Sequence, residues 1–128
     1  MTKQIIHTDK APAAVGPYSQ AVVAPKGNLV FLSGQIGLHP DTGMLVTESF
    51  EAQVEQAFSN MHRVIEAAGG HAQSIVKLTL YLTDLSQFAQ VNEIMARVIP
   101  QPFPARSTVG VVSLPKAATF EVEAIIVV

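Results

Sequence analysis

The 128-residue sequence predicts an α+β fold, in which a mixed six-stranded sheet carries two helices on one face. Two segments place apolar residues at the spacing of a helix, and several others alternate apolar and polar residues as strands do. In chain order the segments read β-β-β-α-β-α-β-β. Because a chain of this length can enclose one hydrophobic core, we expect a single domain over residues 1–128.

Three strands are expected before the first helix. Gln4–His7 predicts a short first strand, and the Pro and Gly residues within Asp9–Pro17 indicate turns. Ala21–Ala24 and Leu29–Ser33 predict the two arms of a hairpin, because the Pro-Lys-Gly-Asn segment between them has the composition of a turn. The segment Leu38–Thr47 then reads as a loop.

Two helices are predicted by apolar stripes that recur every three or four residues. Ser49 is a suitable N-cap for the first helix, and Gly69-Gly70 supplies its end. Asp84 is expected to cap the second helix, over Leu85–Val98, with Gln87 completing a capping box. The first stripe comprises Phe50, Val54, Phe58, Met61, Ile65 and Ala68, and the second comprises Leu85, Phe88, Val91, Met95 and Val98.

Three further strands are expected around and after the second helix. Ile75–Thr83 and Thr119–Val128 both alternate between apolar and other residues, so each has one packed face. A Val-rich strand follows Arg106. Only the short turn segment Ser113–Lys116 separates it from the last strand, so we expect these two strands to pair as neighbours.

The composition predicts a homo-oligomer. Hydrophobic residues make up 48% of the chain and charged residues only 14%, against about 25% charged in an ordinary soluble domain. The surplus of apolar surface requires a subunit interface, and Ile125 and Val127, which share a face with Glu121 and Glu123, indicate where it lies.

Several classes of protein are excluded or disfavoured by the same composition. The net charge is −2 and there is no basic run, which argues against a nucleic-acid surface. The absence of Cys removes disulfides, thiolate nucleophiles and Cys-based metal sites. No apolar run has the length of a membrane span and the first residues lack a signal-peptide core, so we expect a cytoplasmic protein.

Arg106 is the leading candidate for a functional residue. Pro102 and Pro104 flank Phe103 and restrict the backbone that leads to Arg106, so its guanidinium is aimed along one path. A planar guanidinium binds a carboxylate through two parallel hydrogen bonds. With Glu121 or Glu123 at the same sheet edge, the pair would suit a small anionic substrate and proton transfer. The alternative is that Arg106 is a strand-end cation in a structural ion pair.

Other chemistries find no support in the sequence. The four His residues show no metal-ligand spacing, so no metal site is expected. There is no Gly-rich phosphate loop and no nucleophile elbow around any Ser. The remaining options are non-covalent acid–base catalysis or simple binding.

Five motifs resemble those of the RidA family of reactive-intermediate deaminases. Each is weak alone, but together, in this order and spacing, they are specific and cover almost the whole chain. They are Gly16-Pro17-Tyr18-Ser19-Gln20-Ala21, Ser33-Gly34-Gln35-Ile36-Gly37, Val91-Asn92-Glu93, Phe103-Pro104-Ala105-Arg106-Ser107 and Phe120-Glu121-Val122-Glu123-Ala124.

The resemblance implies a chorismate-mutase-like α+β fold and a homotrimer whose sheets form a central barrel, with three sites in clefts between subunits. It also implies hydrolysis of 2-imino acids such as 2-iminobutanoate and 2-iminopropanoate, which arise from the enamines released by pyridoxal-phosphate-dependent dehydratases. The products are 2-oxo acids and ammonia, and no cofactor is required.

The resemblance also assigns roles at matching positions. Arg106 would bind the substrate carboxylate, and Glu121 would activate water and pass a proton to the leaving ammonia. Tyr18 would line the cleft from the neighbouring subunit, although it is alternatively only an interface aromatic.

Ser33, Gly34, Asn92 and the backbone around Thr108 would complete the pocket. Asn92 is alternatively a residue that bridges backbone groups on the second helix. Many members of the family have Cys at the position of Thr108.

Three other functions stay open. The chain is alternatively a non-catalytic module that binds small carboxylates such as 2-oxo acids. An endoribonuclease or translation inhibitor is disfavoured by the low basic content. A chorismate mutase is the most remote, because a shared fold does not transfer a function.

Overall fold

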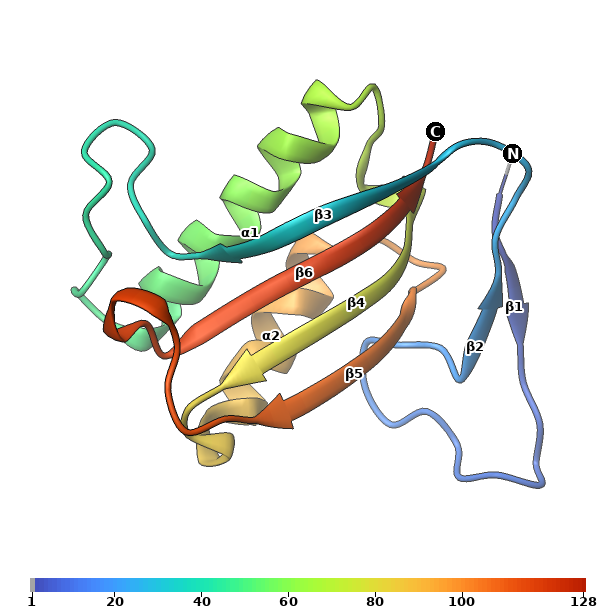
Figure 1. The fold of residues 1–128 in the computed structure, drawn as a ribbon. Coiled ribbons are helices and arrows are strands. Elements are labelled where there is room, and N and C mark those ends of the chain that lie inside the picture. Colours follow the sequence, from blue (N-terminus) through green and yellow to red (C-terminus); the bar gives the residue numbers. More distant parts are fainter. Residues whose placement is uncertain (1) are drawn as a thin grey trace.

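The computed structural model describes residues 2–128 and shows two helices packed on one face of a sheet (Figure 1). The predicted order of strands and helices is confirmed. The strands are β1 (Gln4–Ile6), β2 (Ala21–Val23), β3 (Leu29–Ile36), β4 (Ile75–Leu82), β5 (Ala105–Gly110) and β6 (Phe120–Val127), and the helices are α1 (Phe50–Ala67) and α2 (Phe88–Val98).

The six strands form two sheets instead of the single sheet that the sequence predicts. Strands β3, β6, β4 and β5 lie side by side in that order, and β1 and β2 form a separate antiparallel pair (Figure 1). The predicted hairpin is therefore wrong, because β2 pairs with β1 and not with β3. The turn at Gly27 directs the chain to β6, where Asn28 and Val128 exchange two backbone hydrogen bonds of 2.8 and 2.9 Å.

The predicted pairing of the last two strands is also wrong, because β4 lies between β5 and β6. β4 and β5 are parallel, and α2 forms the crossover between them. β6 runs antiparallel to both β3 and β4. This order leaves β3 at one edge of the sheet and β5 at the other.

The core fills the space between this sheet and the helices. The rings of Phe58 on α1 and Phe120 on β6 lie 5.5 Å apart at its centre. Ser49 caps α1 as predicted, since its hydroxyl accepts a 3.0 Å hydrogen bond from the Ala52 N–H. Asp84 caps a 3₁₀ turn over Leu85–Gln87, and it accepts from Ser86 instead of forming a box with Gln87.

The other face of the sheet carries no helix (Figure 1). Phe31 is 70% exposed there, with Leu29 on the same strand at 55%. Val127 is only 8% exposed, because the turn at Gly27 covers it within the same chain. Val127 is therefore not available to a partner. Ile125, which the sequence also indicates, is half-buried and lies in register with Phe31 on the same face, so the interface on this face stays a prediction, with Phe31 as its most exposed residue.

Candidate active site

Arg106 lies on the edge strand β5, and its side chain lies on the helix side of the sheet. It pairs in register with Leu78, which is fully buried against the helices. Its Nη1 donates a 2.7 Å hydrogen bond to Asn92 Oδ1 and lies 3.6 Å from Met95 Sδ, both on α2. The alternative that Asn92 only bridges backbone groups is excluded, because its amide holds the guanidinium.

Two aromatic rings flank the same guanidinium. Its Cζ lies 4.7 Å from the ring centroid of Tyr18 and 5.0 Å from that of Phe88. Both distances are typical of cation–π contacts. The rings and the Asn92 amide together fix the orientation of the guanidinium before any ligand binds.

No carboxylate balances the charge of Arg106 within residues 2–128. The ion pairs in this part of the chain join His7 to Asp9, Arg63 to Glu66 and Arg97 to Glu55. The alternative of a structural ion pair is therefore excluded within the chain. Burial lowers the pKa of Arg106, but a guanidinium stays protonated in proteins. A half-buried cation without a counterion is suited to an anionic ligand.

Tyr18 reaches Arg106 from the same chain, which corrects the prediction that it comes from a neighbouring subunit. The Ser19 hydroxyl donates a 2.6 Å hydrogen bond to the Phe103 carbonyl, and the Ser19 N–H donates a 2.9 Å bond to the Pro104 carbonyl. These bonds tie the first RidA-like motif to the segment that leads into Arg106. Gly16 has a φ of +134°, a conformation that side chains rarely adopt, and it allows the chain to turn back on Tyr18.

A cavity of about 310 Å³ opens beside Arg106, with Val15, Tyr18, Phe88 and Thr108 as its other lining residues. Its size and its mixture of one cation with aromatic and aliphatic walls fit a small organic anion. Thr108 Oγ1 is buried and has no hydrogen-bond partner among residues 2–128.

Glu121 belongs to a second cluster, near the start of β6. A β-bulge interrupts the pairing of β3 with β6 between Leu32 and Gln35, and it contains Ser33 and Gly34. A Cβ built on Gly34 would overlap the Glu121 carboxylate, so only glycine permits this approach. Burial, and secondarily the charge of Glu123, raises the pKa of Glu121.

Glu123 has a different environment from Glu121. The Tyr81 hydroxyl donates a hydrogen bond to the Glu123 carboxylate, whereas Glu121 has no hydrogen-bond partner among residues 2–128. The sequence left open which of the two glutamates is reactive. The carboxylate with a raised pKa beside the bulge, Glu121, is the more suitable acid–base group.

Within one chain the residues around Arg106 do not meet the residues around Glu121. The prediction that Arg106 and a glutamate share a sheet edge is therefore wrong. β4 separates their strands. Arg106 is in register with Leu78 and Glu121 with Tyr81, three residues further along β4, so the two side chains lie on opposite faces of the sheet.

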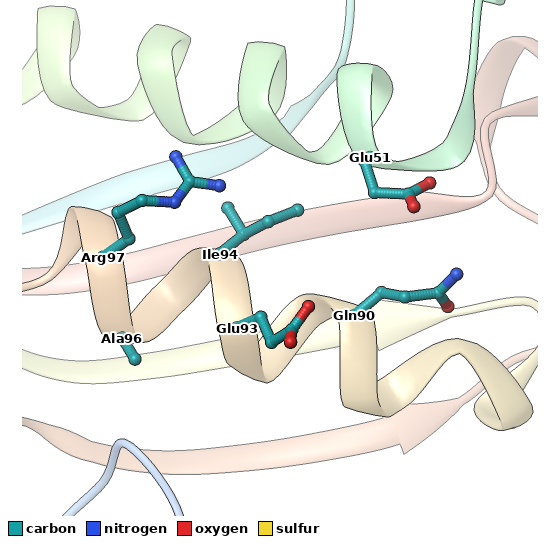
Figure 2. A pocket seen from close by; sticks show the side chains of 6 residues that line it. All are labelled: Glu51, Gln90, Glu93, Ile94, Ala96 and Arg97. Carbon is teal, nitrogen blue, oxygen red and sulfur yellow. The ribbon is translucent and has the colours of Figure 1, made fainter.

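Another cavity lies between α1 and α2. Its volume is about 590 Å³, and Figure 2 shows the side chains that line it, with Glu51 on α1 and Gln90, Glu93, Ile94, Ala96 and Arg97 on α2. None of the predicted site residues lines it. No group of three or more His, Asp or Glu side chains within residues 2–128 is arranged to hold a metal ion. No helix in that range is long and apolar enough to cross a membrane.

Phe88 and Met95 are the functional candidates that the sequence did not reveal. Both were predicted as ordinary core positions of the second helix. The available signal was their spacing, since Phe88, Asn92 and Met95 lie on one face of α2.

The fold and the cavity beside Arg106 define a small α+β protein with a cationic pocket. A family model described as endoribonuclease L-PSP matches residues 8–128. The chain therefore belongs to this family, and it is the RidA family that its five motifs resemble.

Relatives with similar sequences carry deaminase names. The chloroplastic Reactive Intermediate Deaminase A of Arabidopsis thaliana is 52% identical over 123 residues, which are 96% of this chain and 65% of that protein. A 2-iminobutanoate/2-iminopropanoate deaminase of Dermatophagoides farinae is 45% identical over 126 residues, which are 98% of this chain and 97% of that protein.

Solved structures share the fold along nearly the whole chain. RidA from an Antarctic Psychrobacter is 48% identical, with a TM-score of 0.76 and coverage of 98% of this chain and 99% of that one. A putative endoribonuclease from Thermotoga maritima is 43% identical, with a TM-score of 0.77 and coverage of 98% and 97%. The α+β fold class is confirmed.

Proposed function

We propose that this protein is a deaminase that hydrolyses 2-iminobutanoate and 2-iminopropanoate to 2-oxo acids and ammonia. The observation that carries the proposal is the half-buried guanidinium of Arg106, pre-oriented beside a small cavity and without a carboxylate partner within residues 2–128. The names of relatives that match nearly the whole chain support the same reaction.

Arg106 binds the substrate carboxylate. Asn92 and Met95 occupy one side of Nη1, which leaves the remaining N–H groups of the guanidinium for a two-point contact with a carboxylate. The aromatic walls exclude water and so strengthen the charge interaction. Binding in this way fixes the adjacent C2 atom, where the imine is hydrolysed.

Glu121 transfers the protons. It takes one proton from water as the water oxygen bonds to C2, and it passes this proton to the imine nitrogen, which becomes an NH2 group. The remaining hydroxyl proton then moves through Glu121 to the nitrogen as the C2–N bond breaks, so that C2 and oxygen form the carbonyl and ammonia leaves. A carboxyl group whose pKa is raised by burial is suited to both directions of proton transfer.

The complete site requires a second copy of the chain, because Arg106 and Glu121 are separated within one copy. The exposed β5 edge of one copy would meet the β3 edge of the next, which carries Ser33, Gly34 and Glu121. Three such contacts would close a homotrimer with the uncovered sheet faces inside a barrel, where Phe31 becomes buried. A cytoplasmic location is part of this proposal.

Two other functions remain as competitors. A carboxylate-binding module would use Arg106 without turnover. The family description and the Thermotoga structure point to endoribonuclease activity, but the eight Lys and Arg residues form no basic run for a nucleic-acid backbone.

The test generates 2-iminopropanoate and 2-iminobutanoate in situ with an amino-acid oxidase and follows the release of 2-oxo acid. Wild type should accelerate the release and Arg106→Ala should not. No acceleration by folded wild-type protein would favour the binding module, and salt-sensitive RNA cleavage that survives Arg106→Ala would favour the endoribonuclease.

A further inference from the structure

Gln53 is a buried polar residue on α1 to which the proposed reaction assigns no role. The residue is only 5% exposed, yet its amide binds two segments that are far apart in the sequence. Nε2 donates a 3.1 Å hydrogen bond to the Val46 carbonyl. Oε1 accepts bonds of 2.8 and 3.0 Å from the N–H and the hydroxyl of Thr119. Because a buried amide is costly unless it is paired, these bonds hold both segments in one arrangement.

The two segments adjoin the strands that carry Glu121 and the β3 bulge. Thr119 directly precedes β6, two residues before Glu121. The Val46 N–H donates a 2.8 Å hydrogen bond to the carbonyl of Gly37, which follows β3. A Cβ built on Gly37 would overlap the Gln53 backbone, so α1 lies close against the end of β3. Gln53 therefore links the end of β3 to the start of β6, which is its neighbour in the sheet.

This link lies where the pairing of the two strands is weakest. The β-bulge at Ser33–Gly34 interrupts the ladder between β3 and β6. Beyond the bulge, pairing resumes at Gln35 and ends at Ile36, whose partner is Glu121. The Glu121 carboxylate lies against the bulge. So short a stretch of ladder leaves the position of Glu121 dependent on other contacts, and the bonds of Gln53 supply them.

We propose that Gln53 is a positioning residue for the hydrolysis, because its amide holds the start of β6 so that the Glu121 carboxylate stays against the bulge of β3. This inference rests on the proposed function. Gln53 does not line the cavity beside Arg106. It therefore acts on proton transfer and not on the binding of the substrate carboxylate.

The Gln53→Met variant keeps the length of the side chain and removes its polar atoms. In the imine assay its kcat should fall by about 10- to 100-fold, the cost of a small displacement of a catalytic group. Its calorimetric affinity for 2-oxobutanoate should stay unchanged, because Arg106 is untouched. The matched control is Ile65→Ala, a fully buried residue nearer the other end of α1, which should lower the thermal midpoint without changing kcat.

Thr119 provides milder variants that test the same bond from β6, should Gln53→Met fail to fold. Thr119→Val removes the hydroxyl and keeps the N–H that also binds Gln53, so kcat should fall less than in Gln53→Met. Thr119→Ser keeps the hydroxyl and should retain the wild-type kcat. A full loss in Thr119→Ser, or none in Thr119→Val, would argue against the role of this bond.

A titration of the Glu121 carboxyl by NMR gives a readout without turnover, with its resonance assigned by its loss in Glu121→Gln. Burial raises the pKa of Glu121. In Gln53→Met the carboxyl should become hydrated and its pKa should move down toward its ordinary value, whereas Ile65→Ala should leave it raised. The titratable neighbours, Glu123 on β6 and Tyr81 on β4, are intact in both variants, and β3 contains no titratable residue.

The inference would be overturned by a folded Gln53→Met with wild-type kcat, by equal losses of kcat and 2-oxobutanoate affinity, or by an unchanged pKa of Glu121. An inactive wild type would refute the deaminase proposal. The titration would then still decide whether Gln53 positions Glu121.

Discussion

Asn92 and Arg106 are joined by a 2.7 Å hydrogen bond from Nη1 to Oδ1, which crosses from the edge strand β5 to the helix α2. The bond positions the guanidinium without neutralising it, because an amide carries no net charge. It therefore orients the cation and leaves its charge available to a ligand.

Replacement of Asn92 separates these two effects. Asn92→Ala should weaken 2-oxo acid binding by about tenfold or more, since a hydrogen bond to a charged group contributes about 1.5–3 kcal/mol. Asn92→Asp should weaken it further, because the new carboxylate would pair with Arg106 and compete with the substrate. Calorimetric affinities for one 2-oxo acid provide the comparison, and tighter binding by Asn92→Asp than by Asn92→Ala would refute the positioning role.

The ring of Phe88 should contribute through its contact with Arg106. Phe88→Leu keeps an apolar side chain and removes the π face, so 2-oxo acid affinity should fall by about two- to fivefold, equivalent to roughly 0.5–1 kcal/mol. Phe58→Leu, in the core between α1 and β6, is the matched control and should lower stability without changing affinity. Equal affinities for Phe88→Leu and wild type would show that the ring only fills space.

Glu121→Gln should abolish turnover and leave 2-oxo acid affinity largely intact, because the amide cannot transfer protons. The pKa of Glu121 is raised in the folded state, so the folded protein binds more protons than the unfolded chain between the two pKa values. Stability contributed by the protonated carboxyl is therefore lost as pH rises through that window.

The same variant should accordingly be more stable than wild type at neutral pH, and the difference should shrink below the unfolded pKa of the carboxyl. Thermal midpoints measured across acid and neutral pH check this sign. A wild type that gains stability relative to Glu121→Gln as pH rises would contradict the raised pKa.

Phe31 should contribute to the subunit interface. Phe31→Glu places a charge on the uncovered sheet face, so it should shift the protein from trimer to monomer in sedimentation velocity without unfolding it. Val127→Glu is an instructive contrast, because Val127 is buried within its own chain. That variant should instead unfold at lower temperature, and a trimer unaffected by Phe31→Glu would exclude this face as the interface.

The sequence predicts the elements well because their signals are local. The Ser49 cap and the apolar stripe define α1 within one residue of its observed bounds. Strand pairing depends on contacts between distant segments, so β6 was expected beside β5 although it lies between β3 and β4. The burial of Val127 by the turn at Gly27 is a long-range effect of the same kind.

In the candidate site, too, the sequence predicts what depends on local signals and misses what depends on contacts between distant segments. The prolines before Arg106 indicate an oriented guanidinium, and the structure shows that residue held in place. The contact with Phe88 could not be separated from core packing in sequence, because an aromatic residue on an apolar stripe is normally part of the core. The distance between Arg106 and Glu121 depends on which strands are neighbours, which the sequence did not predict.

In the proposed trimer, Arg106 of one copy acts with Glu121 of another. Arg106→Ala and Glu121→Gln chains are each expected to be inactive as homotrimers. The direct test mixes the two variants in equal amounts, allows subunits to exchange, and measures 2-imino acid hydrolysis by the mixed trimers. Random assembly should restore about one quarter of wild-type activity, because one interface in four then combines an intact Arg106 with an intact Glu121. Mixed trimers that remain inactive would contradict a site shared between copies.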